Sequence, residues 1–322
     1  KKQQMINILA NDGISISGIE KLKKNNFNVD VNSVLQDELS DVINQKKISV
    51  ILVRSATKIK KDIIDKCPDL KIIGRGGVGM DNIDVEYAKE KGIHVINTPA
   101  ASSSSVAELV FAHLFGMVRF LFISNRQMPM EGDTNFKKLK KSFSAGKELN
   151  GRTLGIIGFG RIGQEVAKKG IGLGMNVLAH DKFTKEANIT LNFFNGEKKT
   201  FTIETKEMDY ILKNSDFITL HIPKTDEKAI IGAEEIGKMK TGAGIINTSR
   251  GGIIDETALM FALDKGKLSY AGLDVFENEP SPSTHLLMHN ALSLSPHIGA
   301  ATKEAQDRIG IELADQIITY FK

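Results

Sequence analysis

The sequence predicts an α/β protein built on parallel sheets and divided into two domains. Short apolar segments alternate with polar-faced helical segments along most of the chain, a pattern typical of parallel sheets covered by helices. The length of 322 residues is sufficient for two domains of ordinary size. A glycine-rich turn between a strand and a helix begins at Gly158, near the middle of the chain rather than at its start. We therefore expect one domain to be inserted into the other.

Four strands are expected before the glycine-rich turn. They are the segments Ile6–Ala10, Val50–Arg54, Lys71–Gly74 and His94–Asn97. Intervening polar-faced segments, such as 84–91, are expected to be helices. Pro99 and the serines at 102–105 then interrupt the pattern. We expect a hinge near residue 99, followed by a long apolar helix at 106–123 that Ser104 or Ser105 caps.

The glycine-rich turn has the spacing of a dinucleotide-binding unit. A strand at Thr153–Ile157 leads into Gly158-x-Gly160-x-x-Gly163, and a helix follows. In such a unit the first glycine makes the tight turn and the second leaves room for a pyrophosphate. The third lets the helix pack closely on the strand, and the helix N-terminus supplies free N–H groups to the anion.

An acidic residue supports this assignment. The next strand, at Asn176–Ala179, ends at Asp181. A carboxylate at that place would accept hydrogen bonds from both ribose hydroxyls and would repel a 2′-phosphate, which favours NAD over NADP. The neighbouring His180 and Lys182 leave the strictness of that choice open.

Four later segments complete a second sheet. They are Phe217–Leu220, Gly244–Asn247, Tyr270–Leu273 and Leu292–Leu294. With the two strands beside the turn they make six, the number in a complete dinucleotide-binding sheet. The final helical segment at 303–321 is expected to return to the first domain. We therefore predict a Rossmann NAD-binding domain at 99–296, inserted into a flavodoxin-like substrate-binding domain formed by 1–98 and 297–322. A small hairpin is expected within 188–204, where Asn195-Gly196 supplies the turn.

Composition excludes several classes of protein. A net charge of +4 is too small to predict nucleic acid as the main partner. A single cysteine, Cys67, excludes an internal disulfide and a multi-cysteine metal site. No apolar run is long enough to cross a bilayer. His285 and His289 have the spacing of a zinc pair but lack a third ligand, so no metal site is expected. We expect a cytoplasmic protein.

Three segments that follow strands of the second sheet carry candidate catalytic groups: Arg250, Glu279 and His297. The carboxyl ends of parallel strands face one crevice, so we expect these groups to lie near a bound nicotinamide. A guanidinium can grip a carboxylate, an imidazole can transfer a proton near neutral pH, and a carboxylate can orient the imidazole.

Each assignment has an alternative. Arg250 could cap a helix or form a surface ion pair, and His297 could be a structural loop histidine. Glu277 is a second acid two positions before Glu279. Asp274 is expected to be a structural carboxylate or to lie at the edge of the cofactor.

Several longer motifs occur in order along nearly the whole chain. They are 53–57, GRGGVGMDNID at 74–84, GIHVINTP at 92–99, GFGRIG at 158–163, NTSRGGIID at 247–255, GLDVFENEP at 272–280 and PHIGAATKEAQ at 296–306. With them the chain resembles the D-2-hydroxyacid dehydrogenase family, and within it the short phosphoglycerate dehydrogenase branch without a C-terminal regulatory domain. Residues 127–147 match poorly.

The resemblance implies NAD-dependent oxidation of 3-phospho-D-glycerate to 3-phosphohydroxypyruvate, a step of serine biosynthesis. His297 would accept the hydroxyl proton, Arg250 would hold the substrate carboxylate, and Glu279 would fix the imidazole tautomer. The implied cofactor-binding residues are Gly158, Gly160, Arg161, Ile162, Gly163, Asp181, His221, Pro223, Thr248 and Asp274. The implied substrate-binding residues are Arg54, Ser55, Gly76, Gly77 and Val78, with Arg54 as the phosphate contact. Arg75 could instead pair with Asp81 or Asp84.

Two other functions stay open. One is a dehydrogenase or reductase of another D-2-hydroxy acid, such as glycerate with hydroxypyruvate, or D-lactate. The other is an NAD-sensing binding protein similar to a corepressor. The resemblance also implies a homodimer formed through residues 101–150. The lysines at 137, 138, 140 and 141 are expected to form either a solvated helical face or an anion contact.

Overall fold

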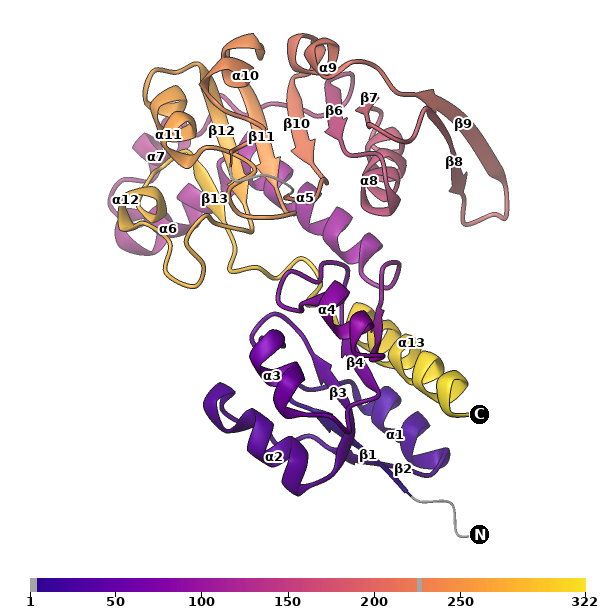
Figure 1. Cartoon of the computed structure of the whole chain (residues 1–322). Helices are drawn as coiled ribbons and strands as arrows, with labels where there is room; N and C mark the ends of the chain where they lie inside the picture. The colour runs from indigo at the N-terminus through magenta and orange to yellow at the C-terminus, as the bar shows by residue number, and fades with distance from the viewer. Residues whose placement is uncertain (1–4, 225–227) are drawn as a thin grey trace. The chain divides into compact units, whose positions relative to one another are not determined.

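A computed structural model describes residues 5–224 and 228–322 (Figure 1). The chain divides into two compact units. Unit 1 comprises Lys1–Ser103 and Ala300–Lys322, and unit 2 comprises Ser104–Gly299. The chain therefore passes between units at 103/104 and 299/300, whereas the sequence placed these crossings at 98/99 and 296/297. The later second crossing puts His297 in unit 2.

Unit 1 contains a parallel sheet of five strands among the described residues. The strands are β1 (Ile6–Ala10), β2 (Phe27–Asp30), β3 (Ile48–Val53), β4 (Ile72–Arg75) and β5 (His94–Asn97). Their order is β2-β1-β3-β4-β5, the flavodoxin-like order that the sequence predicts. The sequence did not predict β2, because its four residues, FNVD, are too few and too polar to stand out.

Helices of unit 1 cover this sheet, and the last of them comes from the far end of the chain. They are α1 (Ile16–Lys24), α2 (Leu39–Gln45), α3 (Lys61–Lys66), α4 (Val85–Glu90) and α13 (Lys303–Phe321), with a 3₁₀ turn η1 (Gln36–Glu38). The backbones of α1 and α13 approach so closely that a Cβ on Gly18 would lie 2.8 Å from the Gly310 carbonyl oxygen. An ion pair between Lys21 and Asp315 at 2.6 Å joins the same helices. The expected return of the final helix to the first domain is confirmed.

Unit 2 contains a parallel sheet of six strands among the described residues. The strands are β6 (Thr153–Ile157), β7 (Asn176–His180), β10 (Phe217–Leu220), β11 (Ala243–Asn247), β12 (Leu268–Leu273) and β13 (Leu292–Leu294). Their order is β13-β12-β11-β10-β6-β7. The direction of strand succession reverses between β6 and β10. In open parallel sheets a ligand binds beyond the carboxyl ends of the strands at such a point.

Two apolar clusters form the core of unit 2. One contains Val110, Leu114 and Val166, from α5 (Ser103–Val118) and α8 (Arg161–Gly172). The other contains residues of α9 (Met208–Asn214), α10 (Ala233–Lys238), α11 (Glu256–Asp264) and α12 (Thr284–Leu287). The expected hairpin is present as β8 (Glu186–Asn192) and β9 (Lys198–Glu204), with Gly196 at φ +87° in its turn.

The helix expected at 106–123 is broken, which corrects the sequence analysis. α5 ends at Val118, and α6 (Leu121–Glu131) and α7 (Phe136–Ser142) follow. Phe120 adopts the left-handed conformation with φ +55°, and its ring packs on Tyr270 and Phe143. Because α5 already begins at Ser103, Ser104 and Ser105 lie inside the helix and do not cap it.

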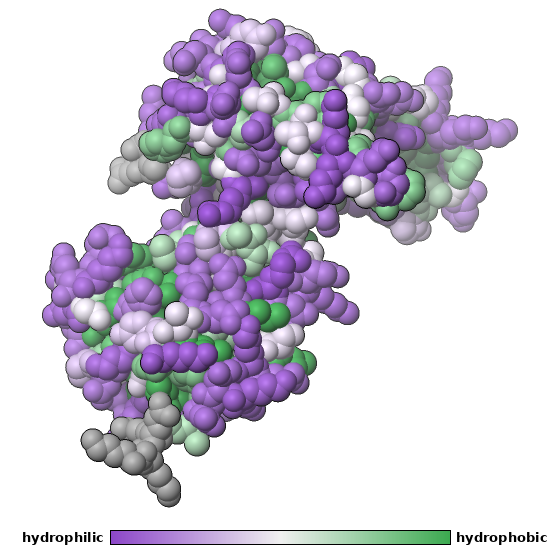
Figure 2. Space-filling model, turned by 90° about the vertical axis from the view of Figure 1, so that its right-hand side faces the viewer, coloured by the Kyte–Doolittle hydropathy of each residue, from purple (hydrophilic) through white to green (hydrophobic). Residues whose placement is uncertain are grey.

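No single helix in the described ranges is long and apolar enough to cross a membrane, although α5 and α6, bent by 56°, pass that test as a pair. On the face shown in Figure 2, hydrophilic residues dominate and apolar residues appear in small groups.

Candidate active site

The glycine-rich turn has the close contacts that its spacing predicts. Gly158 has φ +96°, and a Cβ there would clash with the His221 carbonyl. A Cβ on Gly163 would clash with the Gly158 carbonyl, so this glycine allows α8 to pack on the turn. A Cβ on Gly160, the residue before α8, would meet nothing within 4 Å. Open space at the start of a twelve-residue helix is the cradle that a pyrophosphate needs.

Asp181, the candidate ribose contact, holds this turn. Its carboxylate accepts hydrogen bonds from the backbone N–H groups of Phe159 at 2.7 Å, Phe183 at 2.8 Å and Thr184 at 2.9 Å. Burial alone would raise the pKa of Asp181, but these three donors, with the nearby His180, lower it below its usual value. The group is thus a fixed anion, with acceptor capacity left for a hydroxyl.

Other residues of the predicted cofactor set lie at the ends of neighbouring strands. His221 and Pro223 follow β10, Thr248 follows β11, and Arg161 and Ile162 begin α8. In the part of the chain that the structure describes, the Thr248 hydroxyl and His221 Nδ1 are buried without a hydrogen-bond partner. A dinucleotide could satisfy such groups, so the residues present fit this cofactor.

The turn that carries Arg250 is braced by Asn247. The Asn247 side chain donates to the Arg250 carbonyl at 2.8 Å and accepts from the Ser249 N–H at 3.0 Å. Arg250 Nη1 donates to the Ser249 carbonyl at 2.6 Å. A Cβ on Gly251 would clash with the Phe276 carbonyl. The Arg250 turn therefore packs directly on the loop that leads to Glu279.

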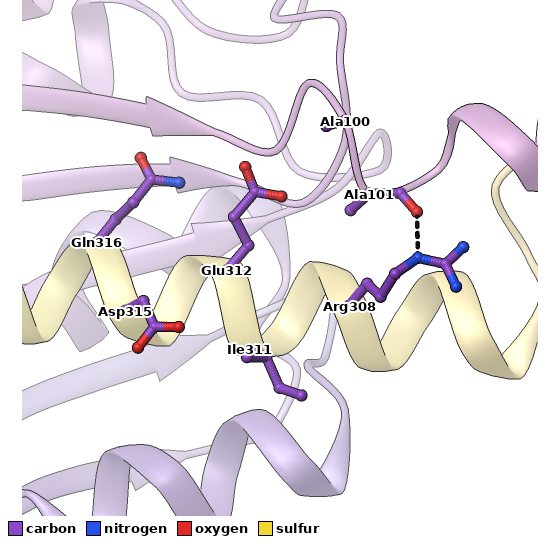
Figure 3. A pocket seen from close by; sticks show the side chains of 7 residues that line it. All are labelled: Ala100, Ala101, Arg308, Ile311, Glu312, Asp315 and Gln316. Carbon is purple, nitrogen blue, oxygen red and sulfur yellow. Dashed lines mark hydrogen bonds between the residues drawn. The ribbon is translucent and has the colours of Figure 1, made fainter. Parts of the chain in front are cut away.

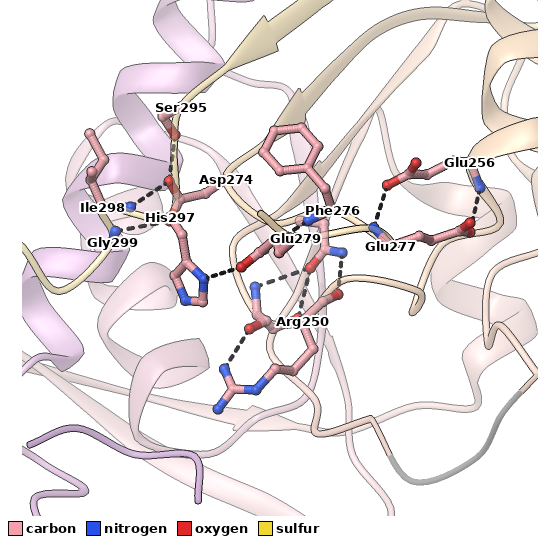
Figure 4. A network of polar contacts seen from close by, with 12 residues as sticks. Arg250, Glu256, Asp274, Phe276, Glu277, Glu279, Ser295, His297, Ile298 and Gly299 are labelled. Carbon is pink, nitrogen blue, oxygen red and sulfur yellow. Dashed lines mark hydrogen bonds and ion pairs between the residues drawn. The ribbon is translucent and has the colours of Figure 1, made fainter. Parts of the chain in front are cut away.

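Glu279 and His297 are in contact, as Figure 4 shows. His297 Nδ1 lies 2.8 Å from Glu279 Oε2, and Glu279 Oε1 accepts from the Phe276 N–H at 3.0 Å. An ionised carboxylate only accepts hydrogen bonds, so Nδ1 carries the proton and donates it. In the neutral ring Nε2 is then free of hydrogen and can act as a base. In Figure 4 the Arg250 guanidinium and the His297 ring extend toward the same side of the network.

Glu277, the alternative acid, is engaged elsewhere. Its carboxylate accepts from the Glu256 N–H at 3.0 Å, and the Glu256 carboxylate accepts from the Glu277 N–H at 2.8 Å. Burial, together with the charges of Glu277 and Glu279, raises the pKa of Glu256. This reciprocal pair holds the loop before Glu279, so the geometry favours Glu279 as the partner of His297.

Asp274 is buried and accepts hydrogen bonds from the loop that carries His297. It is 1% exposed, and its carboxylate accepts from the Ser295 hydroxyl at 2.6 Å and from the N–H groups of Ile298 at 2.8 Å and Gly299 at 2.9 Å. The Asp274 carbonyl accepts from the His297 N–H at 2.9 Å. The structure therefore supports the structural alternative for this carboxylate and ties the His297 loop to unit 2.

Arg54 and Ser55 lie in a turn of unit 1 that two side chains brace. Asp12 accepts from the N–H groups of Arg54 at 2.6 Å and Thr57 at 3.1 Å, and Asn82 donates to the carbonyls of both residues at 2.6 Å. Burial lowers the pKa of Arg54, and the Asp12 charge offsets part of that effect. The sequence analysis gave no role to Asp12 or to Asn82, although Asn82 belongs to the motif at 74–84, because their partners lie 25 to 45 positions away in the chain.

The glycine turn of unit 1 is attached to the strand beside it. Gly77 has φ +142°, its carbonyl accepts from the Thr98 N–H at 3.0 Å, and the Val78 carbonyl accepts from Asn97 at 2.8 Å. Arg75 Nη1 donates to the Gly76 carbonyl at 3.2 Å.

Asp84, one of the two acids expected as alternative partners of Arg75, forms an ion pair with Lys60 at 2.9 Å.

A hollow of about 490 Å³ in unit 1 contains none of the predicted site residues (Figure 3). Its lining residues are Ala100, Ala101, Arg308, Ile311, Glu312, Asp315 and Gln316.

The fold and the site together define a dinucleotide-dependent oxidoreductase. A family model for the NAD-binding domain of D-isomer specific 2-hydroxyacid dehydrogenases matches residues 111–299. The chain belongs to this family, and its cofactor is NAD.

Individual relatives differ in their names. The chain is 45% identical to a hydroxypyruvate reductase of Thermotoga maritima over 92% of each chain. It is 41% identical to a D-3-phosphoglycerate dehydrogenase of Methanocaldococcus jannaschii, over 97% of this chain but 57% of that protein. The chain thus spans little more than half of this second relative. The structure of an NAD⁺-bound 3-phosphoglycerate dehydrogenase from Entamoeba histolytica matches with a TM-score of 0.76 and 28% identity, over 98% of this chain and 95% of that one.

Proposed function

We propose that the protein oxidises 3-phospho-D-glycerate to 3-phosphohydroxypyruvate with NAD, as a cytoplasmic step of serine biosynthesis. The contact between His297 and Glu279 at 2.8 Å is the observation that carries the proposed chemistry. It supplies a base whose tautomer is fixed, beside the turn that presents a guanidinium. The relatives named D-3-phosphoglycerate dehydrogenase support this choice of acid.

In the proposed reaction each side chain has one task. Arg250 holds the substrate carboxylate and polarises the oxygen on the neighbouring carbon. His297 Nε2 takes the proton of the 2-hydroxyl group, and Glu279 stabilises the imidazolium that forms. When bound, NAD accepts a hydride from the same carbon. Arg54 holds the phosphate of the substrate.

Reduction of hydroxypyruvate is the second candidate. The relative named hydroxypyruvate reductase covers 92% of this chain and is itself covered to 92%. Glycerate, the reduced form of hydroxypyruvate, differs from 3-phosphoglycerate only by the phosphate, so the residue that contacts this group distinguishes the two candidates. Arg54 is the candidate for that contact.

Steady-state kinetics, followed by NADH absorbance, test the proposal. We expect turnover of 3-phosphoglycerate, and a KM for it that rises about tenfold or more in Arg54→Ala because one charged hydrogen bond is lost. The KM for unphosphorylated glycerate should not change. His297→Asn is the control for chemistry and should lower kcat by about a hundredfold or more. Equal turnover of glycerate and phosphoglycerate would favour the second candidate. Tight NADH binding without turnover of any 2-hydroxy acid would favour a sensor.

A further inference from the structure

A buried polar chain connects helix α5 to the loop that carries His297. His113, on α5, is 4% exposed; its Nδ1 lies 2.8 Å from Ser293 Oγ and its Nε2 lies 2.9 Å from Ser295 Oγ. Ser295 Oγ in turn donates to Asp274 at 2.6 Å. Asp274 holds the N–H groups of Ile298 and Gly299. These hydrogen bonds thus involve Ser295, two residues before His297, and the two residues that follow His297.

The direction of each hydrogen bond in this chain follows from Asp274. An ionised carboxylate only accepts hydrogen bonds, so the Ser295 hydroxyl donates its one hydrogen to Asp274. The bond between Ser295 and His113 then requires a hydrogen on His113 Nε2. Burial lowers the pKa of His113, and the charge of Asp274 offsets this only in part, so the ring is neutral near pH 7. Nδ1 of the neutral ring must accept from the Ser293 hydroxyl.

The packing around His113 accommodates this ring. A Cβ on Gly272, in β12, would lie 3.0 Å from the His113 Cβ and 3.2 Å from its Cγ. The absence of a side chain at Gly272 therefore lets the imidazole lie against β12, the strand that Asp274 follows.

The loop that carries His297 has a backbone conformation that depends on hydrogen bonds from other residues. His297 has φ +54°, a left-handed conformation that side chains other than glycine rarely adopt. Such a conformation persists only where surrounding bonds determine it. Asp274 makes three of those bonds, to residues 297–299, and the Ser295 carbonyl, Glu279 and the Ser105 hydroxyl make others.

From this geometry we infer that His113 is a positioning residue for the reaction, acting through Ser295 and Asp274 to hold the His297 loop in its active conformation. The inference rests on the proposed role of His297 as the base. His113 touches neither substrate nor cofactor in this proposal. Its donor atom orients Ser295, and Ser295 orients the carboxylate that fixes the loop.

Two variants of His113 test the inference. His113→Leu keeps the volume but removes the donor, whereas His113→Gln keeps an N–H donor that can reach Ser295. In His113→Leu we expect amide hydrogen exchange at Ile298 and Gly299 to become about tenfold faster, the effect of one lost hydrogen bond. We expect kcat for NADH with hydroxypyruvate, and for NAD with 3-phosphoglycerate, to fall about tenfold, with less than about a twofold change in KM for the nucleotide. His113→Gln should recover most of both losses.

Controls separate positioning from general stability. Val110→Ala, in the buried face of the same helix, should lower the melting temperature but leave the exchange of Ile298 and Gly299 and the value of kcat unchanged. Nitrogen-15 NMR of the wild type should show the hydrogen of His113 on Nε2. Unchanged exchange and kcat in His113→Leu, or a hydrogen on Nδ1, would overturn the inference. If the wild type turns over neither acid, the proposed function fails, while exchange and NMR still decide the role of His113.

Discussion

At the scale of single residues, Gly251 joins two loops of the site. A Cβ there would clash with the Phe276 carbonyl, so Gly251→Ala must move the Arg250 turn away from the loop before Glu279. We expect kcat to fall about tenfold or more, because displacements of about 1 Å at a reacting group are that costly, and the protein to lose about 1–3 kcal/mol of stability. Gly237→Ala is the matched control, since a Cβ there meets nothing within 4 Å in helix α10. Steady-state kinetics and urea unfolding measure both effects, and a Gly251→Ala enzyme with normal kcat would contradict this account.

Residues in local motifs could be predicted from the sequence, whereas those in long-range networks could not. The tasks of Gly158, Gly160 and Gly163 follow from their spacing, because a turn between strand and helix is local chemistry. The partners of His113 lie 180 and 182 positions away in the chain. Its position in an apolar helix gives no sign of them. Glu279 was separated from Glu277 by the family motif, and the geometry supplies the physical reason.

At the scale of elements, local turn chemistry and hydrophobic periodicity predicted most of the strands and the β8–β9 hairpin. The break between α5 and α6 was missed, because it depends on Phe120 packing against Tyr270 from a strand 150 residues later. The polar strand β2 was missed because its place in the sheet comes from pairing with β1 rather than from its own pattern. These errors occur where tertiary contacts override a local preference.

Helix α6 carries a prediction about assembly. None of its residues is buried, and Leu121 and Met128, which share one face because they are seven residues apart, are 55% and 43% exposed. Exposed apolar side chains on one helix mark an interaction surface, and we expect a homodimer that buries this face. Light scattering should give twice the chain mass for the wild type and the chain mass for Leu121→Asp combined with Met128→Asp. Phe194→Asp, at the exposed tip of the hairpin, is the control and should stay dimeric. A wild type that is monomeric at every concentration would refute the dimer.

At the scale of the whole molecule, buried histidines make the free energy of unfolding depend on pH in the acid range. Burial lowers the pKa of His221 to about 3 and also lowers that of His113, whereas both titrate near 6.5 when unfolded. Below pH 6.5 the unfolded chain therefore binds more protons, so stability falls as the pH falls from about 6.5 toward 3. The change in the free energy of unfolding with pH has an upper limit of about 1.4 kcal/mol per pH unit for each histidine. Urea unfolding between pH 8 and 4 should show a shallower slope for His221→Gln, whereas replacing the exposed His285 by Gln should leave the slope unchanged.

The alkaline side of the stability curve should depend on unit 1. Burial raises the pKa of Cys67 from 9.0 to about 11, so between these values the folded chain holds a proton that the unfolded chain has lost. Stability then falls as the pH rises from 9 to 11. Both histidines belong to unit 2 and Cys67 to unit 1, and each unit has its own core. Acid should therefore weaken unit 2 first. Between pH 9 and 10 alkali should weaken unit 1 first, because burial raises the pKa of Tyr270 in unit 2 from 10.0 and its effect begins only above that value. Hydrogen exchange resolved by peptide, at pH 5 and pH 10, measures this order, and Cys67→Ala should flatten the alkaline slope of unit 1 alone. An unchanged slope in Cys67→Ala would show that the buried thiol is not its cause.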